Sequence, residues 1–544
     1  MIEKKLLILL CKCRSLFWTL KDKLTFFTIM RRILFIGLAA LFSFSQPTIG
    51  QTIPSTTQVT IAGEGQHTIS PEIYGQFAEH LGSCIYGGLW VGPESPIPNT
   101  AGYRNDVLQA LRDLHVPVLR WPGGCFADDY HWRDGIGPRD QRPKKQNTNW
   151  GGTMEDNSFG THEFLNLCEL LGCEPYVSAN VGSGSVQEME QWVEYMNSEN
   201  DTPMARLRRQ NGRDKAWGVK FLGVGNESWG CGGNMRAEYY ADQYRHFQGF
   251  ARDIDGHNLY RIACGASGGD EHWTDVLMRE AAPLMQGLSL HYYTVADWNN
   301  HGKATQFSED EYYETLATCC KMDGIISGHE AIMDKYDPSK RVGLMVDEWG
   351  TWWDVEDGTN PGHLYQQNTM RDAICAALTL NIFHRHAERV RMANIAQIVN
   401  VLQSMILTNM DGQMVLTPTY HVFEMFRPFQ GATALSVDAQ LPTKESALGT
   451  LPLLSVSAAR TQEGKTVIAL VNASLDADQT AEFAGLTGKV ASARILTSKD
   501  VRDYNDFDRP AVVAPATFKD AKSTKQGLSV KVPAHSIVVV ELDK

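Results

Sequence analysis

Two glutamates stand where apolar segments of the sequence end, and together they could carry out acid–base chemistry. Glu227 follows the apolar segment 221–225, and Glu348 follows the segment 342–346. A carboxylate at the end of a buried strand is unfavourable unless it is paired or functional, so a structural ion pair with an arginine such as Arg120 is the alternative. Two facing carboxyl groups suit glycoside hydrolysis, in which one is protonated to assist the leaving oxygen and the other is ionised to attack or to activate water.

Polar side chains follow other apolar segments in the same way. Glu79 and His80 follow the first segment, Asn180 follows the third, and His291 and Tyr293 follow the sixth. Functional groups of parallel barrels gather at the carboxyl ends of the strands. We therefore expect these side chains to share one rim with the two glutamates.

Eight short apolar segments alternate with amphipathic stretches from about residue 72 to 430, and they are 73–77, 117–121, 175–179, 221–225, 261–264, 288–291, 342–346 and 393–396. Stretches such as 105–114 and 186–196 place apolar residues on one helical face, and Ser185 with Glu188 predicts a capping box before the second. Eight strand–helix units predict an α/β fold, a (β/α)₈ TIM barrel over residues 71–430. A doubly wound open sheet is the structural alternative.

The pattern changes after about residue 430. Segments 454–458, 466–471 and 536–542 have β character, and no helical stretch separates them. They predict a C-terminal antiparallel β-sandwich over residues 431–544. The segment 51–70, which contains the β-like stretch 58–61, is expected to add a strand to this sandwich.

The N-terminal segment, residues 1–50, resembles a targeting signal. Arg31 and Arg32 precede the apolar run 33–42, which is short for a membrane span, and small residues at 48 and 50 offer a cleavage point. These features predict export to the periplasm or the extracellular space, a mature chain from near Gln51, and translation from Met30. A buried N-terminal helix is the alternative.

Composition and charge limit the classes of partner that the chain could bind. The chain has 544 residues, a formal net charge of −13 and no long basic run, so nucleic acid is a poor partner, and no segment predicts a membrane span. Eleven cysteines lack the C-x-x-C pairing of zinc sites. We interpret most of them as buried apolar residues, although export would permit a disulfide.

Several motifs, taken in order, resemble glycoside hydrolase family 51, the α-L-arabinofuranosidases, over nearly the whole mature chain; they are residues 74–82, 85–88, 119–126, 223–227, 291–293, 347–349 and 394–401. The resemblance implies a (β/α)₈ barrel with a β-sandwich and retention of configuration, without a metal or other cofactor. It also implies exo-acting release of terminal arabinofuranose from arabinan, arabinoxylan or their oligosaccharides. Hexamers are frequent in the family, which makes a homo-oligomer an expectation.

The resemblance assigns roles around the two carboxyl groups. Glu227 matches the general acid/base and Glu348 matches the nucleophile. Arg120 matches the arginine beside the nucleophile, where its charge would keep Glu348 ionised. His291 and Tyr293 match residues that form hydrogen bonds to the acid/base and the nucleophile.

Four further positions match sugar-binding residues of the family. Asn226 matches the residue that binds the 2-hydroxyl, and Glu79 matches the glutamate that holds hydroxyls of the furanose. Gln397 is a further match, although Gln403 lies close enough in sequence for the register to slip. Cys125 stands where much of the family has a sugar-contacting asparagine, and a thiol is a weak hydrogen-bonding group.

Other motifs and functions remain as alternatives. Residues 265–269 match the G-x-S-x-G motif of serine hydrolases, which a glycine-rich loop also matches. His384, His386 and Glu388 could hold a metal, although a solvated helical face explains them equally well. The alternatives in function are an endoglucanase or a β-xylosidase on the same scaffold, and a non-catalytic carbohydrate-binding protein.

Overall fold

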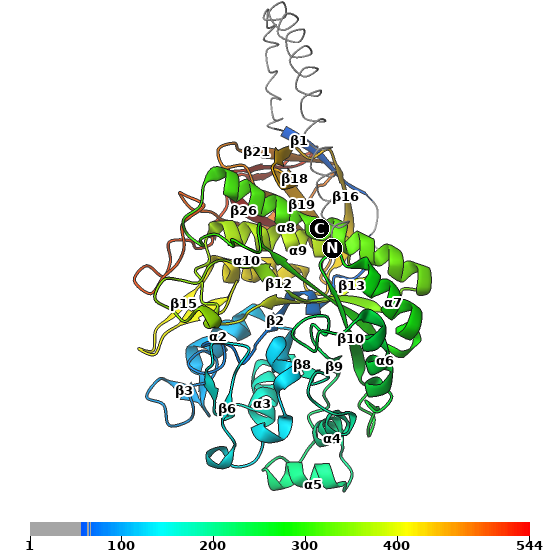
Figure 1. Cartoon of the computed structure of the whole chain (residues 1–544). Helices are drawn as coiled ribbons and strands as arrows, with labels where there is room; N and C mark the ends of the chain where they lie inside the picture. Colours follow the sequence, from blue (N-terminus) through cyan, green and yellow to red (C-terminus); the bar gives the residue numbers. More distant parts are fainter. Residues whose placement is uncertain (1–55, 63–64, 66, 544) are drawn as a thin grey trace, which may run out of the picture. The chain divides into compact units, whose positions relative to one another are not determined.

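A closed barrel of eight parallel strands dominates the computed structural model, which describes residues 56–62, 65 and 67–543 (Figure 1). The strands follow the order β10-β11-β12-β13-β2-β5-β8-β9. Their bounds are β2 Gly75–Phe77, β5 Val118–Trp121, β8 Glu174–Ala179, β9 Phe221–Val224, β10 Tyr260–Ser267, β11 Gly287–Thr294, β12 Gly343–Thr351 and β13 Val390–Ala396. Each predicted apolar segment overlaps one of these strands. The barrel is therefore confirmed and the open sheet is excluded.

Helices connect successive strands and cover the outside of the barrel, as parallel pairing requires. They are α2 Asn105–Leu114, α3 Thr161–Leu171, α4 Val186–Asn197, α5 Pro203–Gln210, α6 Ala237–Gln248, α7 Glu271–Ala281, α8 Glu309–Tyr336, α9 Met370–Arg385 and α10 Pro418–Phe426. At the start of α4, Ser185 Oγ accepts from the Glu188 amide at 3.2 Å. The Glu188 carboxylate lies 3.0 Å from His131 Nδ1, so it is taken up by this contact and the predicted capping box is half formed.

One end of the barrel interior is apolar and the other is polar. A separate buried cluster fills the amino-terminal end, and its members are Val118, Tyr176, Phe221, Ile262, Met345 and Met392. Arg120 lies two residues beyond Val118, and Asp347 lies two residues beyond Met345, so both side chains enter the next layer toward the carboxyl ends of the strands. This change from apolar to polar layers places the chemistry at one mouth.

β1 and nine C-terminal strands form a ten-stranded sheet that folds over a second core. Its bounds are β1 Thr56–Ala62, β16 Thr433–Ala439, β19 Leu454–Arg460, β20 Thr466–Asn472, β21 Gln479–Ala484, β22 Val490–Leu496, β23 Ala516–Thr517, β24 Ala521–Ser523, β25 Gly527–Val532 and β26 Ser536–Leu542. β1 pairs antiparallel with β16 but parallel with β21, which departs from a purely antiparallel sheet. No hairpin joins β1 to β21, because the whole barrel lies between them in the sequence. The connection therefore does not force the two strands to run antiparallel.

Polar contacts join the sandwich to the helices of the barrel. His384 Nδ1 of α9 lies 2.8 Å from Ser457 Oγ, and Asn381 Nδ2 donates to Ser455 Oγ at 3.1 Å. His386 pairs with Glu330, and Glu388 pairs with Lys340. The three residues considered as metal ligands thus have separate partners, and they do not form one of the clusters with metal-ligand spacing found among the described residues.

The predicted targeting segment, residues 1–50, lies outside the described residues. Within the described ranges, none of the helices combines the length and the apolar character that crossing a membrane requires. The domain limits at residues 70 and 430 stay predictions.

Candidate active site

The carboxyl ends of the barrel strands surround a cavity of about 670 Å³, a size suited to a small ligand. The nine residues that match catalytic and sugar-binding positions of the family all lie at this mouth. Those that line the cavity are Glu79, Cys125, Glu227, His291, Tyr293, Glu348 and Gln397. Arg120 and Asn226 are buried against them. His80 and Asn180 do not line the cavity and instead bond to Trp121 and the Tyr130 carbonyl.

Glu227 and Glu348 face each other at short range. One carboxylate oxygen of each, together with a ring nitrogen of His291, forms a cluster whose atoms lie within 4.8 Å of one another. His291 Nδ1 is 2.9 Å from Glu227 Oε1 and 3.1 Å from Glu348 Oε2. Such a separation suits direct attack by one carboxylate, whereas activation of a water needs about 6.5–9.5 Å between the groups.

A β-bulge brings two successive acidic residues into the site. Ser289 of β11 pairs with Met345 of β12, but His291 pairs with Glu348, so β12 holds one extra residue. Successive side chains of a regular strand point to opposite faces, and the bulge breaks this alternation. As a result Asp347 Oδ1 lies 3.3 Å from His291 Nε2 while Glu348 contacts Nδ1 of the same ring.

Glu348 has a charged and a neutral donor on its two oxygens. Arg120 Nη1 donates to Oε2 at 3.0 Å, and the Tyr293 hydroxyl donates to Oε1 at 2.7 Å. Arg120 also donates to the Asp347 carbonyl at 2.8 Å, which fixes the guanidinium beneath the carboxylate. The site thus supplies positive charge to Glu348 from one side.

Glu227 has the opposite electrostatic environment. Burial raises the pKa of its carboxyl, and the negative charge of Glu348 raises it further, although the bond from His291 opposes both. Burial alone would lower the pKa of His291, but Glu348, Asp347 and Glu227 together raise it to about 10. His291 is therefore an imidazolium near neutral pH and donates to the carboxylates around it, while Glu227 is the carboxyl best suited to hold a proton.

Two amides offer unused hydrogen-bonding atoms in this site. Arg120 Nη2 donates to Asn226 Oδ1 at 2.5 Å, which leaves the buried Nδ2 without a partner among the described residues. Gln397 Nε2 donates to Glu79 Oε2 at 3.0 Å, and its buried Oε1 is likewise unpartnered in the described part. Gln403 is used elsewhere, since its Oε1 accepts from the Thr351 amide at 2.9 Å. Of the two glutamines, Gln397 is therefore the one that lines the cavity, and its role in binding sugar stays a prediction.

Glu79, which lines the cavity, accepts hydrogen bonds from three donors. Besides Gln397, the Trp150 indole donates to Oε1 at 2.8 Å and the Phe126 amide donates at 3.1 Å. Burial and the charge of Glu348 nevertheless raise its pKa to about 7. A Cβ on Gly124 would lie 3.3 Å from Glu348 and 3.5 Å from Glu79, so this glycine keeps the space between them open.

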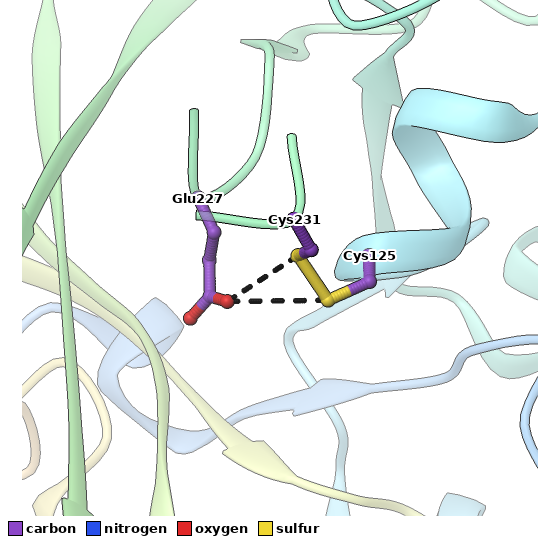
Figure 2. Close-up of side chains that lie close together, drawn as sticks. All are labelled: Cys125, Glu227 and Cys231. Atoms are coloured by element: carbon purple, nitrogen blue, oxygen red, sulfur yellow. Dashed lines mark hydrogen bonds between the residues drawn. A yellow bond between two sulfur atoms is a disulfide. The ribbon is translucent and has the colours of Figure 1, made fainter. Parts of the chain in front are cut away.

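Cys125 forms a disulfide with Cys231, which the sequence analysis did not single out (Figure 2). The two sulfurs lie 4.0 and 3.5 Å from Glu227 Oε2. A disulfide sulfur carries no hydrogen, so neither contact is a donated hydrogen bond in this state. The other described cysteines are free, and all but Cys320 are buried, as expected for apolar residues.

Three other residues of the site had no assigned role in the sequence. Asp347 lies in the Asp-Glu-Trp motif, which was the available signal, and Arg120 and His291 hold its pKa below the usual value despite burial. Asp128 accepts from the amides of Val181, Gly182 and Asn226. Trp150 belongs to a loop, and nothing in its sequence neighbourhood marks it.

A parallel (β/α)₈ barrel with two carboxyl groups this close at its carboxyl-terminal mouth defines the class of glycoside hydrolases. Residues 110–312 match the model of the α-L-arabinofuranosidase 1 domain, and residues 347–536 match that of the α-L-arabinofuranosidase C-terminal domain. The chain belongs to glycoside hydrolase family 51, the α-L-arabinofuranosidases, which confirms the resemblance seen in the sequence.

Individual relatives agree with this assignment. The chain is 58% identical to an intracellular exo-α-L-arabinofuranosidase of Bacteroides ovatus over 90% of its own length and 96% of that protein. It is 34% identical to a probable α-L-arabinofuranosidase C of Aspergillus fumigatus, over 87% of the chain and 94% of that protein. The crystal structure of the family 51 arabinofuranosidase of Xanthomonas axonopodis pv. citri superposes with a TM-score of 0.88 at 50% identity, covering 90% of this chain and 99% of that one.

One expectation is wrong. The run of residues 31–50 predicted export, but the 58% identical Bacteroides ovatus relative is named an intracellular enzyme. A short apolar run after two arginines is a weak signal, because it depends on composition alone and not on any contact of the folded chain.

Proposed function

We propose that the enzyme releases terminal arabinofuranose from arabinan, arabinoxylan or their oligosaccharides by a retaining double displacement. The observation that carries this proposal is the short distance between the carboxyl oxygens of Glu227 and Glu348, within 4.8 Å. The name of the Bacteroides ovatus relative supports exo action and an intracellular site of action.

In the first step Glu348 attacks the anomeric carbon while Glu227 gives its proton to the leaving oxygen. Arg120 and Tyr293 hold the attacking carboxylate in place through both of its oxygens. The unpartnered Asn226 Nδ2 is the donor we assign to the sugar 2-hydroxyl, a contact that strengthens as charge develops on the ring. In the second step Glu227, now ionised, takes a proton from the water that hydrolyses the glycosyl-enzyme.

Hydrolysis of 4-nitrophenyl α-L-arabinofuranoside, compared with the β-xyloside and the cellobioside, tests the proposal. We expect the arabinofuranoside to be cleaved with a kcat/KM at least ~10²-fold above the others, since a pocket built around hydroxyl partners rejects a sugar that leaves them unpaired. Proton NMR of the first product should show the α-anomer. A β-anomer as first product, or preference for the cellobioside, would contradict the proposal.

Glu79→Ala should lower kcat/KM for arabinofuranosides at least ~10²-fold, or about 2.7 kcal/mol of transition-state stabilisation. The reason is that a buried carboxyl with three protein donors is placed to bind sugar hydroxyls. Steady-state kinetics give the ratio, and circular dichroism checks the fold. Glu174→Ala, at the exposed start of β8, is the matched control. Equal loss in both variants would remove Glu79 from the site.

A further inference from the structure

The disulfide beside the acid/base brings together three groups that bind soft metal ions. Cys125 Sγ, Cys231 Sγ and one carboxylate oxygen of Glu227 lie within 4.8 Å of one another (Figure 2). Cys125 begins the short 3₁₀ helix Cys125–Asp129, and Cys231 lies in the loop that follows Glu227. Two thiolates with a carboxylate form a donor set that favours Zn²⁺ over Mg²⁺ or Ca²⁺.

Contacts other than the disulfide hold the two cysteine segments together. Asp128, three residues after Cys125 in the same 3₁₀ helix, accepts from the backbone amides of Val181, Gly182 and Asn226. The loop with Cys231 is closed by the amides of Gly230 and Gly232, which donate to the Glu227 carbonyl at 2.7 and 3.1 Å. Because these bonds do not depend on sulfur, reduction should leave the two thiols as neighbours beside Glu227.

Solvent can reach Cys125, Cys231 and Glu227, so a reductant or a metal ion in solution can reach them too. Cys231 is exposed, while Cys125 and Glu227 are partly exposed and line the cavity. A reductant and a hydrated cation can therefore reach them without unfolding of the barrel. A reducing compartment keeps accessible cysteines as thiols, so the dithiol form is one that the protein meets wherever such conditions hold.

We propose that the reduced enzyme binds one soft divalent cation, such as Zn²⁺, through Cys125, Cys231 and Glu227, and that this cation switches off hydrolysis. A phosphine or a dithiol supplies two electrons and, with water or its own hydrogens, two protons, which convert the disulfide to two thiols. The cation then displaces one proton from each thiol and the proton that Glu227 holds, all of which pass to solvent; it binds the two thiolates and the Glu227 carboxylate, and water takes the fourth position.

The bound cation should abolish hydrolysis because it coordinates a carboxylate oxygen of the general acid, Glu227. Oε2 of Glu227 is the atom nearest both sulfurs, and a carboxylate bound to a cation cannot hold the proton that the leaving oxygen needs. The oxidised enzyme offers only the carboxylate, because disulfide sulfur is not a thiolate ligand. Inhibition should therefore depend on the redox state and should be relieved by a chelator.

The test is a Zn²⁺ titration of the enzyme before and after treatment with tris(2-carboxyethyl)phosphine, with the excess reductant removed. Isothermal titration calorimetry should show one bound Zn²⁺ per reduced chain and binding at least ~10²-fold weaker to the oxidised chain. Hydrolysis of 4-nitrophenyl α-L-arabinofuranoside should fall at least tenfold in the reduced enzyme at saturating Zn²⁺ and return with EDTA. Mg²⁺ at the same concentration should have no effect.

Cysteine variants test which side chains bind the Zn²⁺ ion. Cys231→Ser should bind Zn²⁺ at least ~10-fold more weakly than the reduced wild type, whatever its redox treatment. Cys320→Ser is the matched control, because Cys320 is the one partly exposed free cysteine of the described residues, and it should respond like the wild type. Should Cys231→Ser not fold, reduced wild-type enzyme alkylated at Cys125 and Cys231, with the sites mapped by mass spectrometry, replaces it. Equal Zn²⁺ affinity in oxidised and reduced enzyme, or in Cys231→Ser and reduced wild type, would overturn the proposal.

Discussion

Glu348→Ala should lower kcat/KM at least ~10⁴-fold for every arabinofuranoside, whatever its leaving group, because no other group can attack the anomeric carbon. Arg120 and Tyr293 hold both oxygens of this carboxylate, so it is placed to attack and is not free to rotate away. Added azide is small enough to enter the space that the lost carboxylate leaves. It should restore turnover of an activated aryl arabinofuranoside and give the inverted, β-configured azide, which NMR identifies.

The configuration of the azide product, more than the loss of rate, distinguishes a nucleophilic role of Glu348 from a structural one. Removing Glu348 also leaves Arg120 with one carboxylate fewer, so the thermal midpoint has to be measured beside the kinetics. Glu348→Gln keeps the volume and should be as inactive as Glu348→Ala, but without azide rescue, because the amide fills the space. A folded Glu348→Ala enzyme that azide does not rescue, or that yields the α-azide, would exclude Glu348 as the nucleophile.

The barrel could be predicted from sequence because its strands are buried on both faces and appear as continuous apolar segments. The residues at which the strands begin and end were harder to predict from the sequence. The segment 73–77 begins with Ile73 and Tyr74, yet these belong to the 3₁₀ turn Pro71–Tyr74, and β2 has only three residues. An apolar residue packs equally well in a turn that faces the core, so hydrophobicity alone does not set the boundary.

Glu227 and Glu348 could be singled out from the sequence for a different reason. A charged residue that closes an apolar segment is conspicuous in the sequence, and topology then brings the carboxyl ends of all such segments to one mouth. Neither the bulge that lets Asp347 and Glu348 both enter the site nor the loop position of Trp150 has such a signal. Both depend on pairings between distant segments.

The disulfide illustrates the same limit. Cys125 and Cys231 are 106 residues apart and lie in different loops of the barrel, so only the closed fold makes them neighbours. By the family resemblance, Cys125 stands where many members have an asparagine. Nothing in the sequence pairs this position with a second cysteine four residues after Glu227.

Glu227→Ala should divide substrates by leaving group, in contrast to the general loss expected at Glu348. An activated aryl arabinofuranoside needs little protonation, so its first step should continue, whereas natural glycosides should lose about 10²–10⁴-fold. Azide should then attack the accumulated glycosyl-enzyme from the face that Glu227 leaves open. The product should be the α-configured azide, with net retention, and an inverted azide would exchange the two roles.

The pH profile gives an independent measure of the same assignment. Burial and the charge of Glu348 raise the pKa of Glu227, so the group keeps its proton to a higher pH than an ordinary glutamate. Wild-type kcat/KM should therefore fall as pH rises through this pKa, because the general acid is lost when it ionises. His291, with a pKa of about 10, stays charged over the neutral range and adds no limb there. Glu227→Gln should lack the alkaline limb while its fold is preserved, when both enzymes are assayed with one substrate whose leaving group needs partial protonation. A limb that persists unchanged in this variant would assign it to a different group, and Glu227 would not be the acid.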